Sequence, residues 1–291
     1  MEAFWGELVG TAILLFLGCS VCAGTSLKKS FGNNAGWLAI QFGWGMSVMI
    51  AIFAVGKFSG AHFNPVVTIT FALIGEFPWS EVPGYLLAQL LGAMLGAAAA
   101  YLQYLPHWKE TEDPNVKLTV FVTKPAIPHT FANILSEMLA AFILILALLT
   151  IGANRFSEGL HPLIIGFLIL TLGLSLGGST GAAMNPARDI GPRIIHFLLP
   201  IPGKRDSNWG YAWIPIVGPI MGGSIGGFFY QAVFLGEMIP QLFFSLGLGL
   251  VVLAVSYLAD LNRHKKSDSI GRLQHKTIFG QLVYNEKIRK S

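Results

Sequence analysis

The pair Asn-Pro occurs twice in this chain, at Asn64-Pro65 and Asn185-Pro186, each time after small, Gly-rich residues within apolar sequence. Asparagine is favoured as a helix N-cap, and proline is favoured at the first helical position. Each pair therefore predicts a short helix that begins at membrane depth after a stretch of non-helical backbone. Lipid tolerates such backbone only where protein buries it or where it lines a water-filled cavity. The two copies predict two half-helices and a pore.

The composition indicates a multi-pass membrane protein. Of 291 residues, 53% are hydrophobic and 12% are charged, which is about half the charged fraction of a soluble domain. Several apolar runs exceed the ~20 residues that cross a bilayer. No signal peptide is evident, because Met1 to Glu7 contains no basic residue and no cleavage site follows. The net charge of +4 comes largely from the C-terminal tail, which we interpret as contacting anionic headgroups or aiding solubility, not as binding nucleic acid.

The apolar runs predict an all-α membrane protein with six transmembrane helices and two re-entrant half-helices. The predicted spans are residues 4–25, 37–56, 83–105, 131–152, 161–178 and 212–235, and the half-helices are 65–74 and 187–198. Residues 106–129 contain four prolines and predict an ordered surface connection. The predicted organisation is a channel domain over 1–236, with repeats at about 1–125 and 126–236, an additional hydrophobic helix over 237–260, and a basic tail over 261–291.

The two halves resemble each other. The first opens with Gly6-Glu7-Leu8-Val9-Gly10-Thr11, and the second opens with Ser136-Glu137-Met138-Leu139-Ala140-Ala141. Three spans in the first half make the second half enter from the opposite side of the membrane. This is an inverted repeat, in which the functional site lies between the halves near the midplane.

Arg188 follows the second Asn-Pro pair at membrane depth, where an arginine costs at least about 2.5 kcal/mol. It either reaches the interface or lines the pore, and we favour the pore. There the guanidinium would repel cations, including hydronium, and donate hydrogen bonds to a neutral solute. Cys19 and Cys22 form a Cys-x-x-Cys pair that could be a redox or metal motif. No His, Asp or Glu surrounds them, so we interpret them as core residues and expect no metal and no cofactor.

Glu7 and Glu137 lie within predicted spans, either as proton carriers or as acceptors for the irregular backbone before each Asn-Pro pair. Their matched positions in the two halves favour the scaffolding role. The amides of Asn64 and Asn185 and the two helix N-termini would orient a permeating hydroxyl by its oxygen, which interrupts a proton wire. Backbone carbonyls are expected to form a ladder of acceptors, and the His62 ring is expected to be structural. The ladder residues are Gly60, Ala61, His62, Gly181 and Ala183.

Residues 3–235 resemble the major intrinsic protein family, which comprises the aquaporins and glycerol facilitators. The resemblance rests on the paired Asn-Pro motifs, the contexts Ala-His-Phe-Asn-Pro and Asn-Pro-Ala-Arg-Asp, and the Glu early in each half. Asp189, Arg193 and Pro215-Ile216 resemble the glycerol-conducting branch in particular.

The resemblance implies a selectivity filter of Trp44, Gly173, Ala182 and Arg188, with structural support from Glu7, Glu137 and Asp189. It implies a pore centre at the motif residues Asn64, Pro65, Val66, Asn185, Pro186 and Ala187. Water channels usually have His where Gly173 stands, and glycine leaves room for a carbon backbone. Bacterial facilitators typically have an aromatic residue where Ala182 stands, so its loss predicts a wider filter. The first motif ends in Val66, where the family usually has alanine. The two added methyl groups either change how the two half-helices contact each other or are accommodated by repacking of neighbouring side chains.

The resulting prediction is a passive channel for glycerol and other small neutral solutes, such as dihydroxyacetone, urea and small neutral organic acids. Water would permeate alongside, and protons and ions would be excluded. The alternatives are a water-dominant aquaporin or a proton-coupled secondary transporter that uses Glu7 or Glu137. A membrane enzyme is disfavoured because no nucleophile–base pair, metal cluster or phosphate-binding loop is evident. The resemblance further implies a homotetramer in a bacterial cell membrane, with no nucleic-acid partner.

The charge distribution and the family resemblance disagree on the membrane orientation, and we keep the family orientation for the core because its motifs are more specific than a charge count. Residues 238–259 form a further apolar run, which we leave open between an extra span and a helix lying on the bilayer. The family orientation would place most loop lysines and arginines outside, against the positive-inside rule. Those basic residues are Lys28, Lys29, Lys109, Lys117, Lys124, Lys204 and Arg205.

Overall fold

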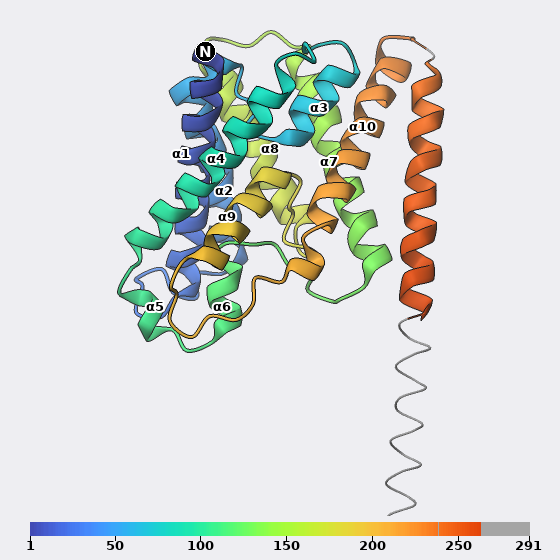
Figure 1. Cartoon of the computed structure of the whole chain (residues 1–291). Helices are drawn as coiled ribbons and strands as arrows, with labels where there is room; N and C mark the ends of the chain where they lie inside the picture. Colours follow the sequence, from blue (N-terminus) through green and yellow to red (C-terminus); the bar gives the residue numbers. More distant parts are fainter. Residues whose placement is uncertain (238, 263–291) are drawn as a thin grey trace, which may run out of the picture.

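The computed structural model describes residues 1–237 and 239–262, and these residues form a helical bundle (Figure 1). The first half contains α1 (Glu2–Ser26), α2 (Gly36–Ser59), α3 (Pro65–Leu73) and α4 (Val82–Gln103). The second half contains α7 (Thr130–Gly152), α8 (Leu160–Leu176), α9 (Pro186–Leu198) and α10 (Ile214–Phe234). Between the halves lie α5 (His107–Glu110) and α6 (Pro114–Thr119), and the short 3-10 helix η1 (Trp209–Tyr211) precedes α10. The predicted all-α membrane fold with two half-helices is confirmed, and the predicted span 161–178 corresponds to the shorter helix α8.

Within the described residues, six helices are long and apolar enough to cross a membrane: α1, α2, α4, α7, α10 and a C-terminal helix, Pro240–Asn262. Helix α8 is apolar but has only 17 residues. The packing repeats between the halves, because α1 packs on α4 as α7 packs on α10. The half-helices cross over, so that α3 packs on α10 and α9 packs on α4. Each half-helix is therefore held by a span from the other half of the chain.

Glycines bring the paired helices into close contact. A Cβ atom at Gly92 of α4 would lie 2.3 Å from the carbonyl oxygen of Leu8 in α1. In the second half, a Cβ atom at Gly222 of α10 would lie 2.0 Å from the carbonyl oxygen of Met138 in α7. Small residues let helix backbones approach in lipid, where packing rather than the hydrophobic effect holds helices together.

The connection between the halves is ordered, as predicted. Trp108 of α5 is fully buried, and its ring stacks on those of Tyr101 and Phe121. Lys117 of α6 donates a hydrogen bond from Nζ to the carbonyl oxygen of Pro202, in the loop after α9. These contacts attach the connection to both α4 and the second half.

The C-terminal helix Pro240–Asn262 lies along the outside of α7 and α10 and runs antiparallel to α10 (Figure 1). Near its start, Leu242 packs with Phe228 close to the end of α10. Near its end, the carboxylate of Asp260 accepts a hydrogen bond of 2.8 Å from the backbone N–H of Phe131, in the first turn of α7. This arrangement along the bundle favours an additional span over a helix lying on the bilayer surface. The predicted tail, 261–291, lies outside the described residues except for its first two positions.

The basic loop residues gather at one end of the bundle. The loops after α1, between α4 and α7, and after α9 lie at the end opposite the N-terminus, where the C-terminal helix also ends (Figure 1). Lys29 and Glu110 form an ion pair of 2.5 Å between two of these loops. The basic loop residues are therefore distributed unequally between the two ends of the bundle. This unequal distribution is the source of the conflict between the positive-inside rule and the family orientation.

Candidate functional site

A cavity of about 640 Å³ lies within the bundle between α2, α7, α8 and the loops before the two half-helices. Its wall follows α2 from Gln41 to Ile52, which is about 16 Å of helix. It reaches Gly152 at the end of α7 and His161 at the start of α8. The cavity therefore extends along the bundle, past both Asn-Pro motifs.

The loops before the half-helices have matching and unusual backbone conformations. Left-handed φ angles occur at Gly60 (78°), Ala61 (58°) and Phe63 (49°), and at Gly181 (87°), Ala182 (49°) and Met184 (48°). Residues with a Cβ atom rarely adopt positive φ, and such conformations persist only where the surroundings impose them. The same pattern in both loops is the inverted repeat expressed in the backbone.

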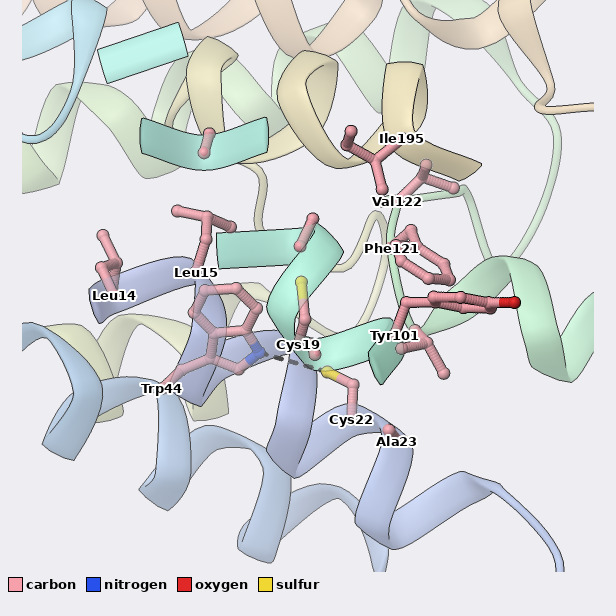
Figure 2. Close-up of a cluster of buried hydrophobic side chains, with 14 of the residues drawn as sticks. Leu14, Leu15, Cys19, Cys22, Ala23, Trp44, Tyr101, Phe121, Val122 and Ile195 are labelled. Carbon is pink, nitrogen blue, oxygen red and sulfur yellow. Dashed lines mark hydrogen bonds between the residues drawn. The ribbon is translucent and has the colours of Figure 1, made fainter. Parts of the chain in front are cut away.

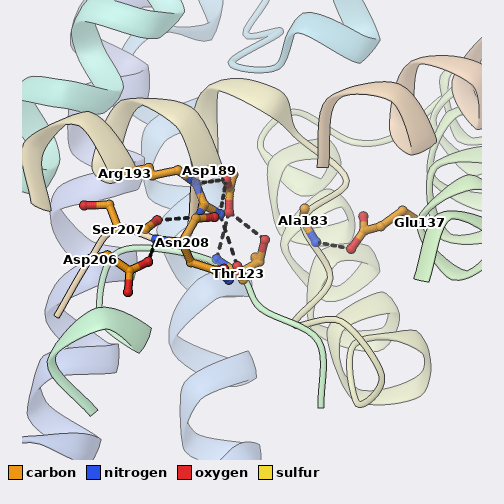
Figure 3. Close-up of polar contacts among 8 residues, drawn as sticks. All are labelled: Thr123, Glu137, Ala183, Asp189, Arg193, Asp206, Ser207 and Asn208. Carbon is orange, nitrogen blue, oxygen red and sulfur yellow. Dashed lines mark hydrogen bonds and ion pairs between the residues drawn. The ribbon is translucent and has the colours of Figure 1, made fainter. Parts of the chain in front are cut away.

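The surroundings that hold each loop include one buried glutamate. The carboxylate of Glu7 accepts hydrogen bonds from the backbone N–H groups of His62 (2.9 Å) and Phe63 (2.7 Å). Glu137 accepts from those of Ala183 and Met184, both at 3.0 Å (Figure 3). Both glutamates are fully buried. Their oxygens satisfy donors that the loops would otherwise leave unpaired, which is the scaffolding geometry.

The predicted ladder residues all line the cavity. They are Gly60, Ala61, His62, Gly181 and Ala183. Among the described residues, no hydrogen-bond donor reaches the carbonyl oxygens of these five residues. The carbonyls are therefore available as acceptors for a solute. The His62 ring bonds through Nδ1 to the Thr68 hydroxyl at 3.0 Å and packs edge-on against Phe71 and Phe77.

Asn64 and Asn185 cap the half-helices that follow them. The Asn64 side-chain oxygen accepts from the N–H of Val66 at 2.9 Å, and that of Asn185 accepts from the N–H of Arg188 at 3.1 Å. Each side-chain NH₂ group donates across the repeat, from Asn64 to the carbonyl oxygen of Met184 and from Asn185 to that of Phe63, at 2.9 and 2.8 Å. An NH₂ group has two N–H bonds, so one from each asparagine remains for the cavity that both residues line.

Trp44 and Arg188 are in direct contact, and both line the cavity. The guanidinium carbon of Arg188 lies 4.2 Å from the centre of the Trp44 ring. The Trp44 indole N–H donates to the Cys22 sulfur at 3.3 Å (Figure 2), and a Cβ atom at Gly18 would lie 2.3 Å from the ring. Trp44 is thus held against α1 and offers carbon atoms to the cavity. Within the described residues, the guanidinium has no hydrogen-bond partner, so its N–H groups are free to bind a solute.

Of the other two predicted filter residues, only Ala182 lines the cavity. Gly173 is covered by Gln41, because a Cβ atom at position 173 would lie 1.8 Å from the Gln41 side-chain oxygen. Gln41 lines the cavity, and the sequence interpretation missed it. The available signal was its position three residues before Trp44, which places both side chains on one face of α2.

Val66 does not line the cavity. It is fully buried, and a Cβ atom at Gly223 of α10 would lie 2.3 Å from its Cγ1. Its added methyl groups are therefore accommodated by a glycine, as repacking between α3 and α10. The motif residues Pro65, Pro186 and Ala187 are likewise buried away from the cavity.

Asp189 and Arg193 form a fully buried ion pair within α9, with a shortest distance of 2.7 Å. Asp189 also accepts from the backbone N–H and the hydroxyl of Thr123, at 2.8 and 2.6 Å. Arg193 donates to the carbonyl oxygens of Ser207 and Asn208 (Figure 3). This network attaches α9, and with it Arg188, to the connection before α7, which is remote in sequence, and to the loop that follows α9.

Cys19 and Cys22 are both buried free thiols. In the part of the chain that the structure describes, no group of three or more His, Cys, Asp or Glu could hold a metal ion.

Comparison with known proteins identifies relatives over most of the chain. The family model described as "Major intrinsic protein" matches residues 1–230. The glycerol uptake facilitator protein of Bacillus subtilis is 57% identical over 258 residues, which cover 89% of this chain and 94% of that protein. The probable glycerol uptake facilitator protein of Thermotoga maritima is 54% identical over 234 residues, covering 80% and 100%. The X-ray structure of the aquaglyceroporin from Plasmodium falciparum superposes with a TM-score of 0.71 at 28% identity, covering 81% of this chain and 97% of that one.

Proposed function

The chain belongs to the major intrinsic protein family, and from this membership and the cavity we propose that it is a passive membrane channel for glycerol and other small neutral solutes. The single observation that carries the proposal is the pairing of an apolar wall at Trp44 with unpartnered donors of Arg188. A polyol has a carbon edge and a hydroxyl edge, and these two walls match them.

In this channel, Trp44, Ala182 and Arg188 form the filter. The guanidinium donates hydrogen bonds to solute oxygens as water is lost, and it cannot accept any. The solute then passes the carbonyls of the two loops and the free N–H bonds of Asn64 and Asn185. No covalent step and no energy coupling are involved, so flow follows the solute gradient.

Exclusion of ions follows from the same groups. The fixed charge of Arg188 repels cations, and the positive N-terminal ends of α3 and α9 add to this repulsion at the centre. The asparagine amides bind a water molecule by its oxygen, which breaks the chain of similarly oriented waters that proton transfer needs. Glu7 and Glu137 hold the loops before the half-helices and do not carry protons, since each carboxylate accepts hydrogen bonds from two consecutive backbone N–H groups.

The family resemblance also supports a homotetramer with one pore per subunit, in the cytoplasmic membrane of a bacterium. The bacterial source of the similar facilitators agrees with this location. Native mass measurement in nanodiscs tests the tetramer, and a single subunit mass would contradict it.

Stopped-flow light scattering on proteoliposomes tests the channel. We expect glycerol uptake that rises linearly with the gradient, exceeds that of empty vesicles, and does not change when a pH difference is imposed. Accumulation of glycerol against its gradient, or uptake driven by the pH difference, would instead identify a proton-coupled transporter. Water flux without glycerol flux would identify a water-dominant channel.

A further inference from the structure

Gln41 is a polar residue at the cavity that neither the family motifs nor the predicted filter includes, and it lies beside the predicted filter residues Trp44 and Gly173. It extends from α2, one turn before Trp44, and only 5% of the residue is exposed. Its carboxamide lines the cavity. Within the described part of the chain, this carboxamide makes no hydrogen bond, although nearly all of the residue is buried. Its amide atoms are not among the fully buried polar atoms that lack a partner, so they remain accessible and can hydrogen-bond water or a solute in the cavity.

The carboxamide occupies the space that a side chain at position 173 would need. A Cβ atom on Gly173 would lie 1.8 Å from the Gln41 side-chain oxygen and 2.6 Å from its amide carbon. Gly173 therefore does not simply widen the cavity, because the space beside it is filled by a side chain from α2.

The neighbouring groups lack what Gln41 provides. Arg188 is a donor only. The indole N–H of Trp44 is turned away from the cavity and is used by Cys22, and Ala182 has no polar side-chain atom. A solute hydroxyl both donates and accepts hydrogen bonds. The carboxamide offers an acceptor as well as two N–H donors, and it adds no charge that would weaken the repulsion of cations.

We infer that Gln41 is a specificity-determining residue of the filter, which hydrogen-bonds a hydroxyl group of the permeating polyol from the position left open by Gly173. The inference rests on the proposed glycerol channel. Three side chains would then surround the solute in the filter. Trp44 contacts its carbon atoms, Arg188 donates hydrogen bonds to its oxygens, and Gln41 both accepts and donates hydrogen bonds.

Two sets of variants test the inference, each assayed for glycerol, erythritol and water flux in proteoliposomes with equal amounts of reconstituted protein. Gln41→Leu removes the hydrogen bonds at similar size, and we expect the ratio of glycerol to water flux to fall by roughly three- to tenfold, the effect of one net hydrogen bond at the barrier. Gln103→Leu, at an exposed position near the end of α4, is the control and should leave the ratio unchanged. If Gln41→Leu does not assemble, Gln41→Met provides the same change with a flexible chain.

The second set tests the contact with Gly173. Gly173→Ala should push the carboxamide into the cavity and reduce erythritol flux more than water flux. The double variant Gln41→Ala/Gly173→Ala should lose no more erythritol flux than Gln41→Ala alone, since the group that the added methyl would displace is gone. An unchanged flux ratio in Gln41→Leu, or purely additive effects of the two alanine substitutions, would overturn the inference. A wild-type protein that takes up water but no glycerol would overturn the proposed function itself, and the inference with it.

Discussion

Asn64 and Asn185 each donate a hydrogen bond to the backbone of the other's loop, at 2.9 and 2.8 Å. Each asparagine also caps its own half-helix. The two half-helices are therefore fixed to each other where they meet, and both asparagines line the same cavity there. The positions of the two asparagine side chains therefore depend on both halves of the chain.

This relationship predicts the effect of Asn64→Asp. The substitution keeps the capping oxygen but removes the N–H that bonds the Met184 carbonyl, and it places a carboxylate at the centre. We expect a loss of about 1–3 kcal/mol of stability from the unpaired carbonyl, together with reduced glycerol flux. Thermal unfolding of the detergent-solubilised protein and vesicle uptake measure the two effects. Asn154→Asp, on a residue that bonds only the exposed end of α7, is the control, and equal melting temperatures for the two variants would contradict the argument.

Glu137→Gln tests the scaffolding role of the buried glutamates. The carboxylate accepts from two consecutive N–H groups of the loop, whereas an amide offers one acceptor oxygen and turns a donor toward the second N–H. We expect a lower melting temperature, corresponding to a loss of about 1–3 kcal/mol in the free energy of unfolding. Glycerol uptake should still not change when a pH difference is imposed. Glu158→Gln, in the exposed loop before α8, should have no effect. If Glu137→Gln retained full stability and instead abolished a pH-driven uptake, the proton-carrier interpretation would replace ours.

Asp189→Asn tests the buried ion pair that positions α9. Removing the charge leaves the fully buried guanidinium of Arg193 without its counter-ion, and breaking such a pair costs about 3–5 kcal/mol. A large drop in melting temperature is expected. The matched control is Asp206→Asn, which breaks the exposed pair with Arg205 and should leave the melting temperature nearly unchanged. Similar melting temperatures for the two variants would show that the buried pair does not stabilise α9.

From the course of the C-terminal helix we predict that Asn262 and the N-terminus lie on opposite sides of the membrane. A cysteine at Asn262 should react with an impermeant thiol reagent from the same side as a cysteine at Lys29. A cysteine at Glu158 should react from the other side only. The unsubstituted protein is the control, because both native cysteines are buried. Labelling of Asn262→Cys from the same side as Glu158→Cys would show that the C-terminal helix does not cross.

Much of the fold follows from local features of the sequence. The lengths of the apolar runs predict the spans, and the Asn-Pro pairs predict where α3 and α9 begin, because an N-cap and a first-turn proline act within a few residues. The inverted repeat could be inferred from the matched positions of Glu7 and Glu137. For the site, Trp44, Ala182 and Arg188 do line one cavity, and their role as a filter stays a prediction.

Other features could not be predicted, because they depend on contacts between residues far apart in the chain. Val66 looks like a disturbance of the pore until Gly223 of α10 is seen to make room for it. In the same way, Gly173 looks like open space until Gln41 is seen to fill it. The course of the last apolar run along α7 and α10 depends on a partner for Asp260 at the start of α7.

By itself, the sequence determined that this chain is an inverted repeat of spans and half-helices with an arginine at membrane depth, because periodicity, capping and the cost of a charge in lipid act locally or through composition. Only the tertiary structure decided which side chains border the cavity and which are packed against other helices. The physical reason is that a side chain's surroundings are set by close packing between elements, where a single glycine or one buried hydrogen bond changes which group has room to face the solute.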